Sequence, residues 1–262
     1  EIDVFVEKER VVHTRETLIQ LVSEFDPERK TALLEVIDAV NPERLGPIAD
    51  RFGQIDIHVL RSLYGLDSAS DEIKAIGDNV IPLIPDGACI QIGVGSPSSY
   101  LPRLGVFDSR VDLGLHTELT VPGIARLVDG GVINGMRKNT HKGKAVAVAW
   151  SGSDDRDLDI IDGNPNFELY EPAYLLNPNT IAMNDRQIGI NNALSVDLTG
   201  QICSESVFGG RMMNGIGGQP ETHLGALYSK GGRAITLLQS TALDGSVSRI
   251  VPKLAEGELV TI

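Results

Sequence analysis

Two glycine-rich turns and one carboxylate are the residues of this chain best suited to chemistry. The first turn is Gly93-Val94-Gly95, and the second is segment 214–219, with the sequence Asn-Gly-Ile-Gly-Gly-Gln. Glycine reaches backbone dihedrals that other residues avoid, so such turns let backbone N–H groups approach a ligand closely. Glu118 lies between the two turns in the sequence, at the end of an apolar run. Because amide donors stabilise the charge that develops when a carboxylate attacks a carbonyl carbon, these residues indicate an enzyme of acyl chemistry.

Each of these features also has a simpler interpretation. Glu118 can cap or flank the helix that follows it, and His116, on the same strand face two residues earlier, can be a packed histidine. The turn Gly93-Val94-Gly95 lacks the third glycine of a dinucleotide fingerprint, which disfavours a nicotinamide site. A plain tight turn and a turn that donates N–H groups to an acyl oxygen both remain open.

One dense basic run, segment 137–144, stands out in the chain and contains Lys138, His141 and Lys144. It can hold phosphates, or it can be a solvated loop before a strand. Asn184-Asp185 has the composition of a polar turn. The serines have no elbow motif and no spaced His/Asp pair, so a serine triad is not expected. The histidines and cysteines show no metal-ligand spacing, so no metal is expected either.

The composition describes a globular protein with an acidic balance. The 262 residues include 23 Lys+Arg and 36 Asp+Glu, for a net charge of −13. This charge disfavours nucleic acids and anionic membranes as partners, while a local basic cluster can still hold a small anion. No run approaches the ~18 apolar residues of a membrane span. Cys89 and Cys203 lie in apolar, strand-like runs, which predicts reduced, buried thiols and a cytoplasmic location.

The hydrophobic pattern predicts two parts. Residues 1–65 are expected to form a strand at 2–6 and a helical module, in which Asp26-Pro27 and Asn41-Pro42 mark two helix starts. The segment begins without Met and without a signal-peptide pattern, which predicts a piece of a longer chain. Residues 66–262 are expected to form an α/β domain, beginning with a helix over 71–83 capped by Ser70.

Short strands alternate with helices through the second part, which predicts a mainly parallel α/β sheet flanked by helices. Strands are expected at 88–92, 111–118, 145–150, 167–170, 180–183, 188–190, 194–198, 234–238 and 248–251, with helices opening at 93–97 and at 121. The first of these helices is expected to run to Leu104 and the second to Val128. Loops after parallel strands form the ligand-binding edge of a sheet, and both Gly95 and Glu118 fall there.

Taken in order, these motifs resemble the acetyl-CoA hydrolase/transferase family, whose members include acetate, butyrate and 4-hydroxybutyrate CoA-transferases. The segments that carry the resemblance are 86–95, 113–118, 141–144, 184–185, 196–206, 215–219, 229–232 and 248–252. The resemblance therefore extends from about Ile73 to the C-terminus. It implies an α/β CoA-transferase fold of two similar halves, of which this chain is mainly the second, and a homodimer or higher homo-oligomer.

The resemblance also implies roles for individual residues. The family nucleophile carries over to Glu118. The oxyanion-stabilising amides carry over to Val94, Gly95, Gly217 and Gly218. Substrate or CoA binding is expected from Gly93, Gln219, Asn184, Lys138, His141 and Lys144. The implied reaction moves CoA between an acyl-CoA and a small carboxylic acid through a glutamyl-CoA thioester, with coenzyme A as a substrate and no permanently bound cofactor.

Two alternative functions remain open, and one loop departs from the family pattern. Acyl-CoA hydrolysis results if water reaches the anhydride or the glutamyl-CoA intermediate. A non-catalytic CoA-binding or assembly domain is favoured by residues 10–63, which do not align with the family. After Gln219 the chain reads Pro-Glu-Thr-His over 220–223, where relatives usually carry an aspartate and an aromatic residue. Because this loop is expected to border the acyl pocket, it predicts an unusual substrate.

Overall fold

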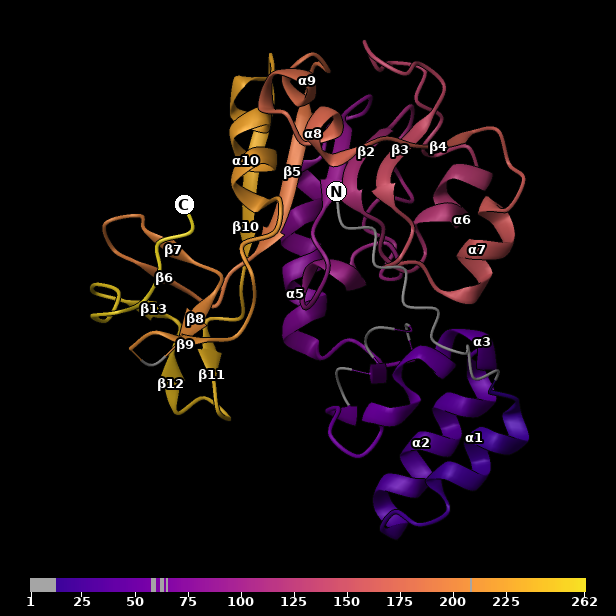
Figure 1. Cartoon of the computed structure of the whole chain (residues 1–262). Coiled ribbons are helices and arrows are strands. Elements are labelled where there is room, and N and C mark those ends of the chain that lie inside the picture. The colour runs from indigo at the N-terminus through magenta and orange to yellow at the C-terminus, as the bar shows by residue number, and fades with distance from the viewer. Residues whose placement is uncertain (1–12, 58–59, 62–63, 65, 208) are drawn as a thin grey trace, which may run out of the picture. The chain divides into compact units, whose positions relative to one another are not determined.

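The computed structural model describes residues 13–57, 60–61, 64, 66–207 and 209–262. These residues form two compact units that divide between Asp67 and Ser68. In Figure 1 the colour runs from indigo to purple along the first unit and from purple through magenta and orange to yellow along the second. The strand predicted at 2–6 lies outside the described residues.

The first unit is a helical module with its own apolar core. It contains α1 (Arg15–Val22), α2 (Pro27–Ala39), α3 (Pro42–Leu45) and the 3₁₀ helix η1 (Gly46–Arg51). Both predicted helix starts are confirmed: the Asp26 side chain accepts from the Arg29 N–H at 3.0 Å, and the Asn41 side chain accepts from the Glu43 N–H at 2.9 Å. The core contains Leu18, Leu33, Val36, Leu45 and Phe52.

A six-stranded parallel sheet is the centre of the second unit, as the strand–helix alternation predicted. The strands follow the order β10-β5-β1-β2-β3-β4. Their bounds are β1 Cys89–Ile92, β2 Gly114–Leu119, β3 Ala145–Ala149, β4 Phe167–Leu169, β5 Gln187–Asn192 and β10 Arg233–Leu237. Because each neighbouring pair is parallel, the carboxyl ends of β1, β2 and β5 meet at one edge of the sheet.

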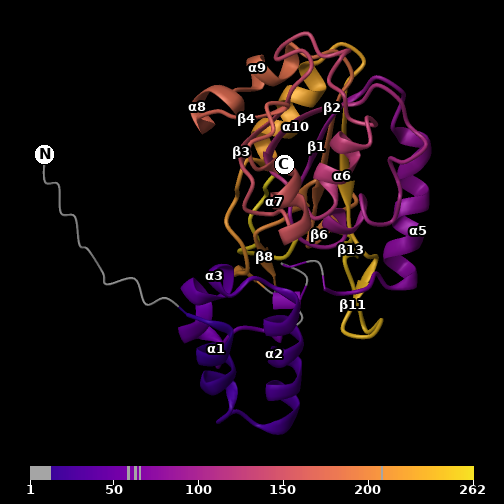
Figure 2. The same ribbon diagram turned by 90° about the vertical axis from the view of Figure 1, so that its right-hand side faces the viewer.

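Helices cover both faces of this sheet. They are α5 (Asp71–Val80), η2 (Ile81–Leu83), η3 (Ser98–Tyr100), α6 (Ile124–Asp129), α7 (Asp155–Ile161), α8 (Pro172–Leu175), α9 (Pro178–Ala182) and α10 (Gln219–Tyr228). Figure 2 shows α5 on one side of the strands and α8 and α9 on the other. The face toward α5 is apolar, with Ile90, Leu115 and Ile190 in the main core.

The opposite face carries buried polar side chains, because alternate residues of a strand point to opposite faces. Gln91, His116 and Asn191 lie there, and all three are buried. Helix α10 packs on β5 and β10 at this face. Gly189 permits the close approach, since a Cβ at this position would lie 3.1 Å from the Thr222 carbonyl oxygen.

Short strands form the C-terminal part of the second unit. They are β6 (Ser195–Asp197), β7 (Ile202–Cys203), β8 (Ser206–Val207), β9 (Arg211–Met212), β11 (Thr241–Ala242), β12 (Val247–Ser248) and β13 (Ile250–Val251). The Asp197 carboxylate organises this region by accepting the N–H groups of Thr199, Gln201 and Leu254. The Thr199 hydroxyl, with the Leu254 and Gln201 amides and the Gln201 side chain, lowers the pKa of Asp197.

Two predicted elements are wrong. The segment predicted as a strand at 180–183 lies at the end of helix α9, which begins with Asn177 as its cap and Pro178 in its first turn. The helix predicted to open at 93–97 forms only η3 followed by turns. Here the Ser99 hydroxyl accepts the Gly95 N–H and the Ser98 hydroxyl donates to the Gly95 carbonyl, bonds that compete with helix formation.

Candidate active site

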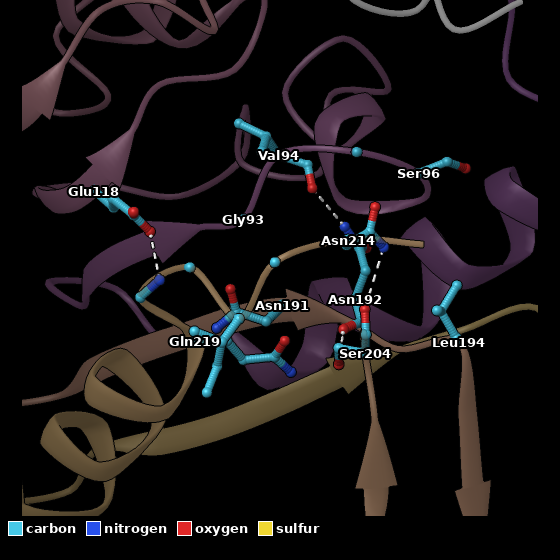
Figure 3. Close-up of a pocket in the computed structure, with 15 residues that line it drawn as sticks. Gly93, Val94, Ser96, Glu118, Asn191, Asn192, Leu194, Ser204, Asn214 and Gln219 are labelled. Carbon is cyan, nitrogen blue, oxygen red and sulfur yellow. Dashed lines mark hydrogen bonds between the residues drawn. The ribbon is translucent and has the colours of Figure 1, made fainter. Parts of the chain in front are cut away.

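One pocket joins both glycine turns to Glu118 at the carboxyl ends of β1, β2 and β5. It has a volume of about 400 Å³. The structure brings together seven of the predicted site residues there: Gly93, Val94, Gly95, Glu118, Gly217, Gly218 and Gln219. The remaining wall consists of Ser96, Asn191, Asn192, Leu194, Ser204, Asn214, Gly215 and Ile216 (Figure 3). The pocket thus places amide donors and a carboxylate within one cavity.

The second glycine turn holds the Glu118 carboxylate directly. The Gly218 N–H donates to Glu118 Oε2 at 3.0 Å (Figure 3). Gly217 has a φ of +55°, in the left-handed region that favours glycine. Gly218 is the N-cap of α10, so the carboxylate also lies at the positive end of that helix dipole. The side chain is therefore fixed by a backbone donor and a favourable field.

Asn192 and two serines fix the first glycine turn. The Asn192 side-chain amide donates to the Val94 carbonyl at 2.9 Å and to Ser98 Oγ at 2.7 Å, and it accepts the Ser98 N–H at 3.0 Å. The Gly95 N–H donates to Ser99 Oγ at 2.8 Å. Of the two amides predicted to stabilise an oxyanion in this turn, that of Gly95 is therefore engaged inside the turn. The Val94 amide is then the better candidate donor for a ligand.

Replacing Asn192 with alanine is expected to loosen this turn and to lower kcat by about 10-fold to 100-fold, because a preorganised donor loses its fixed position. Hydrogen exchange at the Ser98 amide, which donates to Asn192 Oδ1, should become faster in the same variant. Steady-state kinetics and exchange mass spectrometry measure both effects. The exposed Asn179, replaced by alanine, is the matched control and should change neither. Equal kinetics in the two variants would contradict this role for Asn192.

A reciprocal amide pair with Gln91 holds Asn191 of the pocket wall. Gln91 Nε2 donates to Asn191 Oδ1 and Asn191 Nδ2 donates to Gln91 Oε1, each at 3.1 Å. Asn191 Nδ2 also donates to Thr222 Oγ1 of α10 at 3.1 Å. Gln91 and Asn191 are not among the site residues predicted from the sequence. The sequence feature that could have revealed them is a polar side chain at alternate positions of a strand that is otherwise apolar.

Four predicted binding residues lie elsewhere. Lys138, His141 and Lys144 precede β3, and Asn184 precedes β5, so all four belong to the amino ends of the strands, opposite the pocket. Lys138 is buried, and its ammonium donates to the carbonyls of Leu115 and Lys144 at 2.8 and 2.9 Å. Burial lowers the pKa of Lys138.

The Asn184 side chain, like that of Lys138, is hydrogen-bonded within the protein: its Oδ1 accepts the N–H groups of Asn139 and Thr140 at 3.1 and 3.2 Å. The His141 ring packs at a tilt against Tyr170 with ring centroids 4.5 Å apart, and Lys144 pairs with Glu168. In the structure these residues of the basic run make local packing contacts and hydrogen bonds, and their role in substrate or CoA binding stays a prediction. The structure does not bring these residues to Glu118.

His116 is a packed histidine in the structure, the simpler of its two interpretations. It is 1% exposed, and its Nε2 donates to the Leu175 carbonyl at 2.8 Å. Burial lowers the pKa of His116 to about 4. The ring is therefore neutral near neutral pH and holds α8 against β2.

This burial makes stability depend on pH. Histidine in an unfolded chain has a pKa of about 6.5. Between about pH 6.5 and 4 the unfolded chain therefore binds one more proton at this position than the folded chain does. The free energy of unfolding falls as the pH falls through that window. From pH 7 to 5 the contribution of His116 is expected to be about 2 kcal/mol. Urea unfolding of the wild type and of His116→Asn at both values measures it. The wild type should lose more stability, whereas equal losses would contradict the pKa shift.

Both cysteines are buried and free, as predicted. Burial raises the pKa of the Cys89 thiol to about 11. In the described ranges no three histidine, cysteine or acidic side chains are grouped so that they could hold a metal ion. No described helix is both long and apolar enough to cross a membrane.

Comparison with known proteins identifies the family. Residues 154–262 match the acetyl-CoA hydrolase/transferase C-terminal domain. The 4-hydroxybutyrate coenzyme A transferase of Clostridium kluyveri is 43% identical over 73% of this chain and 44% of its own length. The succinyl-CoA:cyclohexane-1-carboxylate CoA transferase of Geobacter metallireducens is 41% identical over 72% and 42%.

Solved structures agree with this match. RipA from Yersinia pestis has a TM-score of 0.66 and 35% identity over 74% of this chain and 43% of its own. A 4-hydroxybutyrate CoA-transferase from Porphyromonas gingivalis has a TM-score of 0.59 and 36% identity over 72% and 44%. The chain spans less than half the length of the curated relatives it matches. By its matched domain and these relatives, the chain belongs to the acetyl-CoA hydrolase/transferase family.

Proposed function

We propose that this chain supplies the reacting carboxylate of a CoA-transferase, which moves CoA between an acyl-CoA and a small carboxylic acid. One observation carries the proposal: the Gly218 N–H holds Glu118 Oε2 at 3.0 Å in a pocket shared with the Gly93-Val94-Gly95 turn. The two curated relatives compared above support it, since their names are 4-hydroxybutyrate coenzyme A transferase and succinyl-CoA:cyclohexane-1-carboxylate CoA transferase. We further propose that the protein is cytoplasmic, that it forms a homo-oligomer, and that coenzyme A is one of its substrates.

The reaction has two half-reactions with Glu118 as nucleophile. A carboxylate oxygen attacks the thioester carbonyl, the C–S bond breaks, and CoA leaves as a thiolate from a mixed anhydride. The thiolate then attacks the glutamyl carbonyl carbon, which releases the first carboxylic acid and leaves a glutamyl-CoA thioester. A second carboxylate attacks this thioester, and the returning thiolate takes its acyl group. Glu118 ends as a free carboxylate.

Two oxyanions form in this sequence, one on the acyl carbonyl and one on the glutamyl carbonyl. The Gly218 amide already contacts Glu118, so it suits the glutamyl oxygen. The Val94 turn lies across the same pocket and suits the acyl oxygen. Separate donors for the two carbonyls explain why one site needs two glycine turns.

Intact mass of the full chain, measured after incubation with butyryl-CoA and no acceptor acid, tests the proposal. The expected product is the protein plus CoA less one water, as the glutamyl-CoA thioester. Release of free CoA without an adduct would replace the proposal with acyl-CoA hydrolysis. Absence of both adduct and release would replace it with a non-catalytic CoA-binding or assembly domain.

A further inference from the structure

The loop after β3 lies beside the segment that follows the nucleophile. Strands β2 and β3 are parallel neighbours, and Leu119 pairs with Ala149 at their carboxyl ends (Figure 1). The chain therefore leaves both strands at the same edge of the sheet, in one case directly after Glu118 and in the other on the way to α7. Within the described chain, residues 150–157 are not part of the pocket wall, so any role in the reaction has to act through other residues.

Two residues of this loop contact both parts of the site. Ser153 Oγ and Thr120 Oγ1 are hydrogen-bonded at 2.7 Å, and both side chains are buried. Gly152 lies directly against the Thr120 backbone, because a Cβ there would lie 1.7 Å from the Thr120 carbonyl oxygen. The same Cβ would lie 3.3 Å from Val94 Cγ1. The loop thus touches the chain two residues after Glu118 and also the turn that carries the candidate oxyanion donor.

The Asp157 carboxylate joins this loop to the start of α6. Its Oδ2 accepts the Gly123 N–H at 2.8 Å, and its Oδ1 accepts the Ala125 N–H at 3.1 Å. Gly123 is the N-cap of α6, with a φ of +89° and no side-chain cap of its own. A carboxylate from α7 therefore satisfies amides that the start of a helix leaves without intrahelical partners.

Asp157 is kept in this place at an energetic cost. Its side chain is 2% exposed. Burial, together with the nearby charge of Asp154, raises the pKa of Asp157 to about 6. Such desolvation opposes stability, and carboxylates held in this way occur preferentially at functional sites.

We infer that Asp157 is a positioning residue for the proposed reaction: it holds residues 120–125 against the loop that also contacts Val94, and so keeps the nucleophile and the acyl-oxygen donor at a fixed separation. This inference rests on the proposed function and adds to it a residue outside the pocket. Because Asp157 acts through the backbone that follows Glu118, its loss should slow the chemical steps and leave substrate binding nearly unchanged.

Asp157→Asn in the full chain tests the inference. Asparagine has nearly the size of aspartate but only one side-chain oxygen, so one of the two N–H groups would face an NH2 group. In transfer from butyryl-CoA to acetate, kcat should fall about 10-fold to 100-fold, the usual effect of a small misplacement of a reacting group. The KM values for both substrates should stay within about 3-fold of the wild type.

Asp197→Asn is the matched control. Asp197 is another buried carboxylate that accepts three backbone N–H groups, and neither it nor its partners line the pocket. Both variants should lose thermal stability, but only Asp157→Asn should lose kcat. Equal losses of kcat would assign the effect to general destabilisation and overturn the inference. An unchanged kcat in Asp157→Asn, or a raised KM alone, would also overturn it, while transfer by the wild type would leave the proposed function intact.

Ser153→Ala provides a second test, which decides if Asp157→Asn does not fold. This change removes the hydroxyl bonded to Thr120 and should lower kcat about 3-fold to 10-fold at unchanged KM, as expected for one hydrogen bond. An unchanged kcat would then overturn the inference that this loop positions the site. Absence of transfer by the wild-type chain would overturn both the inference and the proposed function.

Discussion

Replacing Glu118 with glutamine is expected to abolish CoA transfer, lowering kcat by at least about 10⁴-fold, because the change removes the nucleophile on which every later step depends. Glutamine has nearly the same size as glutamate, and its amide oxygen can accept the Gly218 N–H. In the wild type this N–H lies 3.0 Å from Glu118 Oε2. The fold should therefore remain. The loss should appear in kcat and in the covalent adduct, whereas binding of CoA should change little.

Two measurements check this expectation: steady-state transfer from butyryl-CoA to acetate, and intact mass with butyryl-CoA alone. Glu171→Gln is a suitable control, since Glu171 is exposed and makes no side-chain capping bond at α8. This control should transfer CoA and form the adduct as the wild type does. Near-full activity in Glu118→Gln, with the adduct retained, would show that another residue is the nucleophile.

The sequence predicted the parts of this site that follow from local rules. Glycine turns after parallel strands must lie at the carboxyl edge of a sheet, and this placed both Gly95 and Glu118 correctly at that edge. The helix starts at Pro27 and Pro42 follow from the capping residue and the proline alone, and no tertiary contact is needed to predict them. The same signal at Asn177-Pro178 predicts α9, but the apolar residues after it were interpreted as a strand.

The sequence does not decide the surroundings of residues that are contacted by distant parts of the chain. A basic run can face solvent, a phosphate or the protein interior, and local sequence does not separate these cases. Lys138 is buried because Gly114 leaves room for it: a Cβ there would lie 2.5 Å from Lys138 Cγ. The amide pair of Gln91 and Asn191 joins strands separated by 100 residues. Only the fold brings these two groups together, so this pair was not predicted.

Gly218→Ala is expected to lower kcat by about 10²-fold to 10³-fold, which is the usual effect of losing one oxyanion donor. The donor is lost because the new methyl group displaces the Glu118 carboxylate from the Gly218 N–H. Gly218 has a φ of −94°, which alanine adopts without strain, so the effect is steric. The new Cβ would lie 2.7 Å from Glu118 Oε2 and 3.2 Å from Glu118 Cδ. A flexible side chain yields more readily than backbone, so the carboxylate should move away and the fold should remain.

Gly215→Ala tests whether this effect comes from the contact with Glu118 or from any added methyl group in the loop. Gly215 belongs to the same turn and lines the same pocket, but a Cβ there has no heavy atom within 4 Å. Its kinetics should stay within a few-fold of the wild type, and thermal unfolding of both variants should be similar. If both variants lost activity equally, general disturbance of the loop would explain the result. If neither did, the bond from Gly218 to Glu118 would have no part in catalysis, and the nucleophile would need no backbone donor from this turn.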